Sequence, residues 1–232
     1  GVVKRVRAAQ APNRDPWPVI TLEGDDSVVA TSNGAETDFA VFITKSGQLL
    51  KFPVDSVRPQ GLPAGGVAGI KLAEGDEVIF FGAVNETPEA SVLTVSEPTG
   101  ALPGTVPGRG KISLLTQFPA KGRATMGVRA QRMLSGEGSL SIAWAGPHGP
   151  KAVGAAGTEV PLPEEPERRD ASGTHLKAPL LTRKSVSTFA TTRWAQTRAV
   201  CRSASSLGHV PDLGQPPLCL VQHLLRLALL VT

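Results

Sequence analysis

The sequence predicts an all-β fold made of about three propeller-like, four-stranded blades. In segments such as residues 48–53, apolar and polar side chains alternate with a period of two, which is typical of half-buried strands. Residues 46–84 and 108–146 also share one layout: an apolar strand, Phe-Pro, a basic Gly-rich loop ending in Gly-Val, a strand, a Gly/Glu turn and a final strand. Such repeats indicate propeller blades. An ordinary all-β domain with similar turns is the alternative.

Turn motifs place the strands within these units. Aligning Glu23-Gly24-Asp25 with Glu74-Gly75-Asp76 gives an offset of 51 residues, whereas aligning Phe52-Pro53 with Phe118-Pro119 gives 66. Because glycine can adopt the positive φ of tight turns, hairpins are expected between 19–22 and 27–31 and between 67–72 and 77–81. Residues 38–44 and 91–95 predict further strands.

The chain divides into a β region, residues 1–176, and a tail, residues 177–232. The tail is rich in Arg, Ser, Thr and Pro and lacks the blade pattern, so we expect most of it to be disordered. Its last stretch, 218–231, could form a short helix because its leucines share one helical face. A disulfide between Cys201 and Cys219 is one alternative for the two cysteines, which lie 18 residues apart.

Charge is unevenly distributed. The formal net charge is +4, yet residues 1–150 hold 14 basic and 14 acidic side chains, so the excess comes from the tail. Residues 98–136 contain six basic side chains and no acidic one. A local basic stripe of this kind indicates a protein that follows a phosphate backbone.

Several kinds of chemistry are not predicted. The sequence has no GxxxxGK[ST] phosphate loop, and its four histidines are scattered without metal-ligand spacing. We therefore predict no catalytic residue, no metal site and no cofactor. No apolar run reaches the roughly 18 residues of a membrane span, so no membrane partner is expected. The aromatic residues are expected in the core, not as base-stacking platforms: Trp17, Phe42, Phe52, Phe80, Phe118 and Trp144.

Several motifs occur together and in order: residues 57–61 (VRPQG), 69–72 (GIKL), 75–78 (GDEV), 101–105 (ALPGT) and 119–125 (PAKGRAT). With them, the chain from residue 1 to about 176 resembles the C-terminal region of the A subunit of bacterial type IIA topoisomerases. These enzymes are DNA gyrase and topoisomerase IV, and the actinobacterial branch is the most similar. The resemblance implies a partial β-pinwheel, a ring of four-stranded blades whose basic rim binds and bends duplex DNA. Because the chain is shorter than the family's complete domain, we expect a fragment.

The resemblance also implies partners and a location. The partners are duplex DNA, the ATPase B subunit and the remainder of the A subunit, in the cytoplasm and associated with the nucleoid. Type IIA enzymes cut DNA with a tyrosine hydroxyl, and this chain contains no tyrosine, so catalysis must occur elsewhere in the enzyme. The alternative function is a propeller-type protein-interaction scaffold with no nucleic-acid role.

The predicted DNA contacts are basic residues of the blade-like units, because Lys and Arg pair with phosphates. They are Lys4, Arg5, Lys51, Arg58, Arg109, Lys111, Lys121, Arg123, Arg129 and Arg132. A simpler interpretation is that Arg123, Arg129 and Arg132 keep a blade edge soluble.

The DNA-wrapping loop of gyrase is a basic, Gly-rich box, and this chain matches it only in part. Residues 58–66 and 121–127 are the nearest matches, with Leu62 and Pro63 where a second basic residue is expected. This departure weakens the expectation of gyrase-type supercoiling more than that of a topoisomerase IV-like role.

Overall fold

The computed structural model describes residues 1–7, 19–102, 105–154, 157–180 and 226–231. Strands dominate these residues: β1 (Val2–Arg7), β2 (Val28–Asn33), β3 (Phe39–Thr44), β4 (Gln48–Pro53), β5 (Val67–Ala68), β6 (Val78–Val84), β7 (Ser91–Pro98), β8 (Arg109–Leu114), β9 (Val128–Arg129), β10 (Glu137–Gly146), β11 (Ala152–Val153), β12 (Glu159–Val160), β13 (Thr174–His175) and β14 (Arg226–Val231). Two 3₁₀ turns, η2 (Val54–Ser56) and η3 (Leu115–Gln117), follow β4 and β8. The predicted all-β fold is confirmed.

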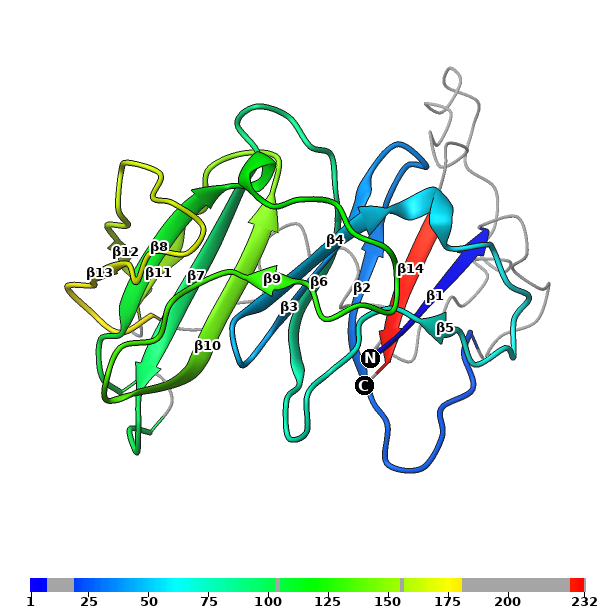
Figure 1. The fold of residues 1–232 in the computed structure, drawn as a ribbon, viewed down its shortest axis with the longest axis horizontal. Coiled ribbons are helices and arrows are strands. Elements are labelled where there is room, and N and C mark those ends of the chain that lie inside the picture. Colours follow the sequence, from blue (N-terminus) through cyan, green and yellow to red (C-terminus); the bar gives the residue numbers. More distant parts are fainter. Residues whose placement is uncertain (8–18, 103–104, 155–156, 181–225, 232) are drawn as a thin grey trace, which may run out of the picture.

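Three antiparallel four-stranded sheets stand side by side (Figure 1). The first sheet has the order β2-β14-β1-β5, the second β6-β3-β4-β9 and the third β10-β7-β8-β13, while β11 and β12 form a separate pair. Strand β6 contacts β2 on one side and β10 on the other, so these three strands form the inner edges of the blades. The short strands β5, β9 and β13 lie at the opposite, outer edges.

The structural offset between the repeats differs from the one obtained by aligning Phe52-Pro53 with Phe118-Pro119. The turns η2 and η3 begin at Val54 and Leu115, 61 residues apart, and the positive-φ turns at Gly75 and Gly136 have the same separation. The predicted offset of 66 is therefore wrong. Phe52 lies in β4, whereas Phe118 directly follows η3, and its structural equivalent is Val57 after η2.

The outer strands belong to segments that leave their own sheet. We call these segments the first arm (residues 58–71), the second arm (119–132) and the third arm (165–178). They pair with β1, β4 and β8 respectively, the third strands of the preceding sheets. At the start of each pairing the amides of Gln60, Lys121 and Glu167 donate to the carbonyls of Arg5, Lys51 and Ile112 at 2.9, 2.9 and 2.7 Å. Each blade is thus completed by the next repeat.

A glycine lets each arm approach the strand backbone. Gly66, Gly127 and Gly173 occupy equivalent positions with φ of +91°, +79° and +78°. A Cβ atom there would lie 2.9 Å from the Val3 carbonyl oxygen at Gly66 and 2.7 Å from that of Gly110 at Gly173, and at Gly127 it would overlap the Leu49 carbonyl oxygen. Only glycine combines this φ with so close an approach.

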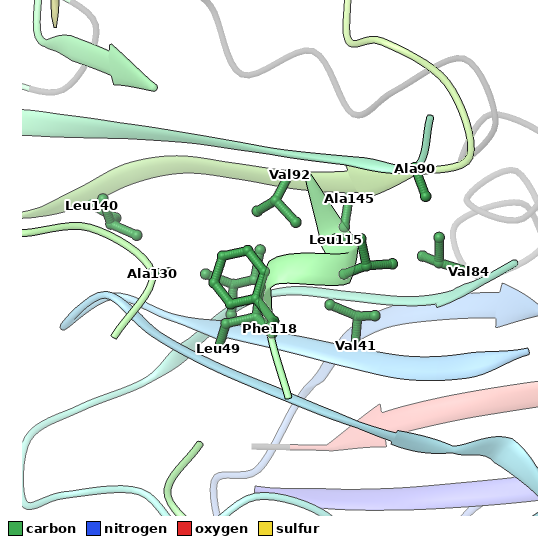
Figure 2. Packing of buried hydrophobic residues seen from close by; sticks show 11 residues of the cluster. Val41, Leu49, Val84, Ala90, Val92, Leu115, Phe118, Ala130, Leu140 and Ala145 are labelled. Carbon is green, nitrogen blue, oxygen red and sulfur yellow. The ribbon is translucent and has the colours of Figure 1, made fainter. Parts of the chain in front are cut away.

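The hydrophobic core lies between the sheets and is closed by the 3₁₀ turns. Between the first and second sheets, Val54 and Val57 of the η2 region pack with Phe42, Phe52 and Phe81. Between the second and third sheets, Leu115 and Phe118 fill the equivalent place (Figure 2). A third cluster, which includes Val95 and Val160, lies beyond the third sheet.

The aromatic residues follow this arrangement. Phe42 stacks on Phe52 with ring centroids 5.4 Å apart, and Phe118 is buried. Phe80 and Trp144 are partly buried and pack against the second and third clusters. These residues are core, as predicted, whereas Trp17, Cys201 and Cys219 lie outside the described residues.

Three local predictions are wrong. Residues 19–22 form no strand, so there is no hairpin there. The turn at Gly75 does not close a hairpin either, because β5 pairs with β1 in the first sheet and β6 with β3 in the second. Of the stretch 218–231, residues 226–231 form β14, since the free backbone groups of β1 and β2 pair with it on both sides. Residues 181–225 of the tail lie outside the described residues.

Gly127→Ala is expected to lower the free energy of unfolding by roughly 2 kcal/mol or more, because the new Cβ combines left-handed strain with overlap of the Leu49 carbonyl. Denaturant unfolding measures this. Gly122→Ala in the same arm is the control: its Cβ would meet open space, and we expect a change within about 0.5 kcal/mol. Equal effects of the two substitutions would contradict the close-approach argument.

Candidate nucleic-acid interface

The three arms are hydrogen-bonded to one another. The Lys71 amide of the first arm donates to the Thr125 carbonyl of the second at 3.0 Å. The Arg132 amide of the second arm donates in the equivalent way to the Ala171 carbonyl of the third at 3.1 Å. The outer edges of three blades therefore form one continuous backbone structure.

Arginine side chains reinforce these links. Nη1 of Arg123 donates to the Ala68 carbonyl of the first arm at 2.7 Å, and Nη1 of Arg169 donates to the Arg129 carbonyl of the second arm at 3.5 Å. The two contacts are equivalent in the repeat. Leu62 occupies the same position in the first arm and has no guanidinium to offer.

The first and second arms present only positive charge. Residues 58–71 and 119–132 contain no Asp or Glu. Their exposed basic side chains, which we call the basic rim, are Arg58, Lys71, Lys121, Arg123, Arg129 and Arg132. The third arm differs, because it carries Arg168, Arg169 and Lys177 together with Glu165, Glu167 and Asp170. The basic rim is thus centred on the second arm.

Half of the predicted DNA contacts lie on this rim: Arg58, Lys121, Arg123, Arg129 and Arg132 are all exposed. Arg109 is mostly buried, with 22% of its side chain exposed. Its Nη2 donates to the Gly173 carbonyl at 2.7 Å, and its Nε lies 3.7 Å from the Glu137 carboxylate. Arg109 therefore anchors the third arm to β8 in this structure.

The remaining four predicted contacts are buried and bonded inside the protein. Lys4 and Lys111 occupy equivalent positions in β1 and β8. The Lys4 ammonium donates to the carbonyls of Val19, Leu62 and Ala64 at 2.7, 3.1 and 2.7 Å. The Lys111 ammonium donates to the carbonyls of Ala130, Arg168 and Arg169. Each lysine thus holds an arm in place.

Burial changes the acid–base properties of these two ammonium groups. Desolvation disfavours the charged form, so it lowers the pKa of Lys4. The same cause lowers the pKa of Lys111 to about 8, although Glu167 and Asp170 oppose the shift.

Arg5 and Lys51 form a second equivalent pair, which joins neighbouring blades. Nη1 of Arg5 donates to the Val54 and Val57 carbonyls of the η2 region, and its Nη2 lies 2.6 Å from Glu36. The Lys51 ammonium donates to the Leu115 carbonyl of η3 at 3.2 Å and pairs with Glu86. In this conformation none of the four buried cations is presented to a ligand, so their role as DNA contacts stays a prediction.

The sequence pattern missed four basic residues of the arms, Lys71, Arg168, Arg169 and Lys177. The structural offset of 61 residues pairs Lys71 with Arg132, so the correct register would have identified Lys71. Arg169 is equivalent to Arg123 in the next repeat, where the Glu-rich surroundings concealed it.

Two kinds of feature are absent from the part of the chain that the structure describes. These residues contain no group of three or more His, Cys, Asp or Glu side chains arranged to hold a metal ion. Among the same residues, no helix is long and apolar enough to cross a bilayer.

Sheets completed by arms from the following repeat, placed side by side around inner strands, define a β-pinwheel, a propeller of strand-exchanged blades. The model of the DNA gyrase C-terminal β-propeller domain matches residues 38–85 and 108–141. These residues make up most of the second and third sheets, and they are similar to the DNA gyrase C-terminal domain family. The predicted resemblance is confirmed.

Curated relatives show the same similarity. The DNA gyrase A protein of Deinococcus deserti is 34% identical over 133 residues, which are 55% of this chain and 15% of that protein. The gyrase A protein of Salmonella typhimurium is 29% identical over 121 residues, 52% of this chain and 12% of the relative. The topoisomerase subunit TopoM of Mycolicibacterium smegmatis is 33% identical over 102 residues, 44% of this chain and 13% of the relative. The chain thus spans less than a sixth of their length.

Solved structures show the same fold. The C-terminal domain of DNA topoisomerase IV superposes with a TM-score of 0.54 at 17% identity, covering 77% of this chain and 58% of that one. The C-terminal domain of DNA gyrase A superposes with a TM-score of 0.52 at 21% identity, covering 70% and 53%.

Lys51→Met is expected to lower the free energy of unfolding by about 2–4 kcal/mol, because it leaves the Leu115 carbonyl and the partly buried Glu86 carboxylate without their donor. Chemical denaturation measures the loss. Lys45→Met, which breaks the exposed pair with Glu77, is the matched control and should cost less than about 1 kcal/mol. Similar costs at both positions would show that the buried pair does not join the blades.

Lys111 should make stability depend on pH. Between pH 8 and 10.5, its folded and ordinary pKa values, the unfolded chain binds more protons than the folded one, so stability should rise with pH. The expected gain is on the order of 2 kcal/mol. Lys111→Leu, which copies Leu50 at the equivalent position, should lose this slope in urea titrations from pH 7.5 to 10.5. An identical slope in both proteins would contradict the assignment.

Proposed function

We propose that the basic rim binds the phosphate backbone of duplex DNA and bends it, as an accessory part of the A subunit of a type II topoisomerase. The observation that carries this proposal is the run of exposed basic side chains across two hydrogen-bonded arms, with no acidic residue between residues 58 and 71 or between 119 and 132. The similarity to gyrase and topoisomerase IV C-terminal domains supports it.

The physical basis is charge held on a rigid edge. Phosphate contacts come mainly from Arg and Lys, and they supply affinity and position without reading the sequence. Backbone bonds between the arms keep the rim side chains from one blade to the next at set separations. A duplex that follows the outer edges of successive blades has to curve, and each added phosphate contact offsets part of the bending energy.

The composition of the first arm helps to distinguish a gyrase-like role from a topoisomerase IV-like role. Leu62 and Pro63 leave that arm without the cation that Arg123 supplies in the second arm. A weaker first arm fits a domain that bends DNA locally better than one that wraps it, so we favour a topoisomerase IV-like role.

The remaining partners follow from the same proposal. DNA cleavage would use a tyrosine from the remainder of the A subunit, since this chain contains none, and ATP would be hydrolysed by the B subunit. The protein would then act in the cytoplasm, on the nucleoid.

Removing two positive charges from the basic rim should weaken DNA binding and reduce its dependence on salt. In the full chain, Arg129→Gln with Arg132→Gln is expected to lower affinity for a 40-base-pair duplex by roughly tenfold or more in low salt. The slope of log affinity against log salt should fall by nearly two, because about 0.9 counterions are released for each phosphate contact. Fluorescence anisotropy over a salt series measures both, and donor–acceptor labels on the duplex ends measure bending.

The matched control is Lys45→Gln with Lys151→Gln, which removes the same charge from exposed positions outside the arms. It should leave affinity within about twofold and the slope unchanged. Equal losses in the two double variants would assign binding to overall charge or to the basic tail. A duplex that does not bind at low salt would favour the interaction-scaffold function.

A further inference from the structure

The second position of each sheet is the most enclosed one. In the second and third sheets it is held by β3 and β7, which are hydrogen-bonded on both sides. Nearly all of their side chains are buried. In both cases this strand directly precedes the third strand of the same sheet in the sequence, so the two form a neighbouring pair.

The first sheet fills this position differently. Its second strand is β14, which lies between β1 and β2 and pairs with both in antiparallel register (Figure 1). All six residues of β14 are paired with β1, from Arg226 opposite Arg7 to Val231 opposite Val2. Residues 181–225 separate this strand from the nearest preceding described residue, Leu180.

Without β14 the first sheet would have a gap. Strands β1 and β2 are not neighbours in the sheet, so each would expose an unpaired row of amides and carbonyls. Val3 of β1 and Val29 and Ala30 of β2 also contribute to the core between the first and second sheets. The gap therefore selects an extended segment of about six residues with apolar side chains, and RLALLV has this composition.

We infer that the position between β1 and β2 is a strand-acceptor site, which β14 of the same chain occupies and which a free strand of the same sequence can also enter. Like β3 and β7, the occupant is bound by backbone hydrogen bonds on both edges, but unlike them it does not directly precede the third strand of its sheet in the sequence. The covalent connection favours the chain's own strand by raising its local concentration. This inference is independent of the proposed DNA binding.

The test uses the full chain with Leu229→Pro, which removes an amide from the centre of β14, where Leu229 lies opposite Lys4 and Thr31. Leu229→Val is the control, because valine favours strands. Hydrogen exchange should be at least tenfold faster in β1 and β2 of the proline variant and unchanged in β7. The labelled peptide RLALLVT should bind the proline variant at least tenfold more tightly than the wild type and restore the protection of β1.

Other outcomes would overturn the inference. Protection of β1 and β2 that survives Leu229→Pro would show that β14 is not their partner. Equal peptide affinity for wild type and proline variant would place the peptide elsewhere on the protein. Wild-type dimers that lose β1 protection on dilution would assign the site to the strand of a second copy.

Discussion

The whole arrangement depends on the free edge of the third strand in each sheet. β1, β4 and β8 have one edge that their own repeat does not cover, and unpaired backbone groups at that edge are costly when buried. The arm of the next repeat pairs with this edge and then returns to its own sheet. Neighbouring blades are therefore joined through the backbone, and each 3₁₀ turn closes the core between them.

Buried cations make the same junctions specific. An ammonium or guanidinium group inside a protein must recover its lost hydration through hydrogen bonds and a counter-charge. Lys4 and Lys111 find carbonyls of the arms, and Arg5 and Lys51 find carbonyls of the 3₁₀ turns together with a glutamate. The predicted DNA contacts thus fall into two groups, those within β1, β4 and β8, which bond to other parts of the protein, and those on the arms, which are exposed.

The residues of the arms therefore set the charge of the outer edge. All charged side chains of the first and second arms are basic, and hydrogen bonds fix the backbone of both arms. The third arm mixes both signs of charge, and its Arg169 contacts the second arm as Arg123 contacts the first. The match to the gyrase C-terminal domain model includes the residues that build the second arm and its supporting strands.

Local sequence pattern by itself determined the long strands β3, β4, β6, β7 and β8, the turns at Gly75 and Gly136 and the apolar core, because side-chain alternation and glycine φ are local properties. Only the tertiary structure decided that β5, β9 and β13 join the preceding sheets and that β14 is a strand. It also decided that Lys4, Arg5, Lys51 and Lys111 are buried while Arg129 and Arg132 are exposed. These features depend on which distant backbone edge is free to pair, and a period of two along one strand carries no information about its partner.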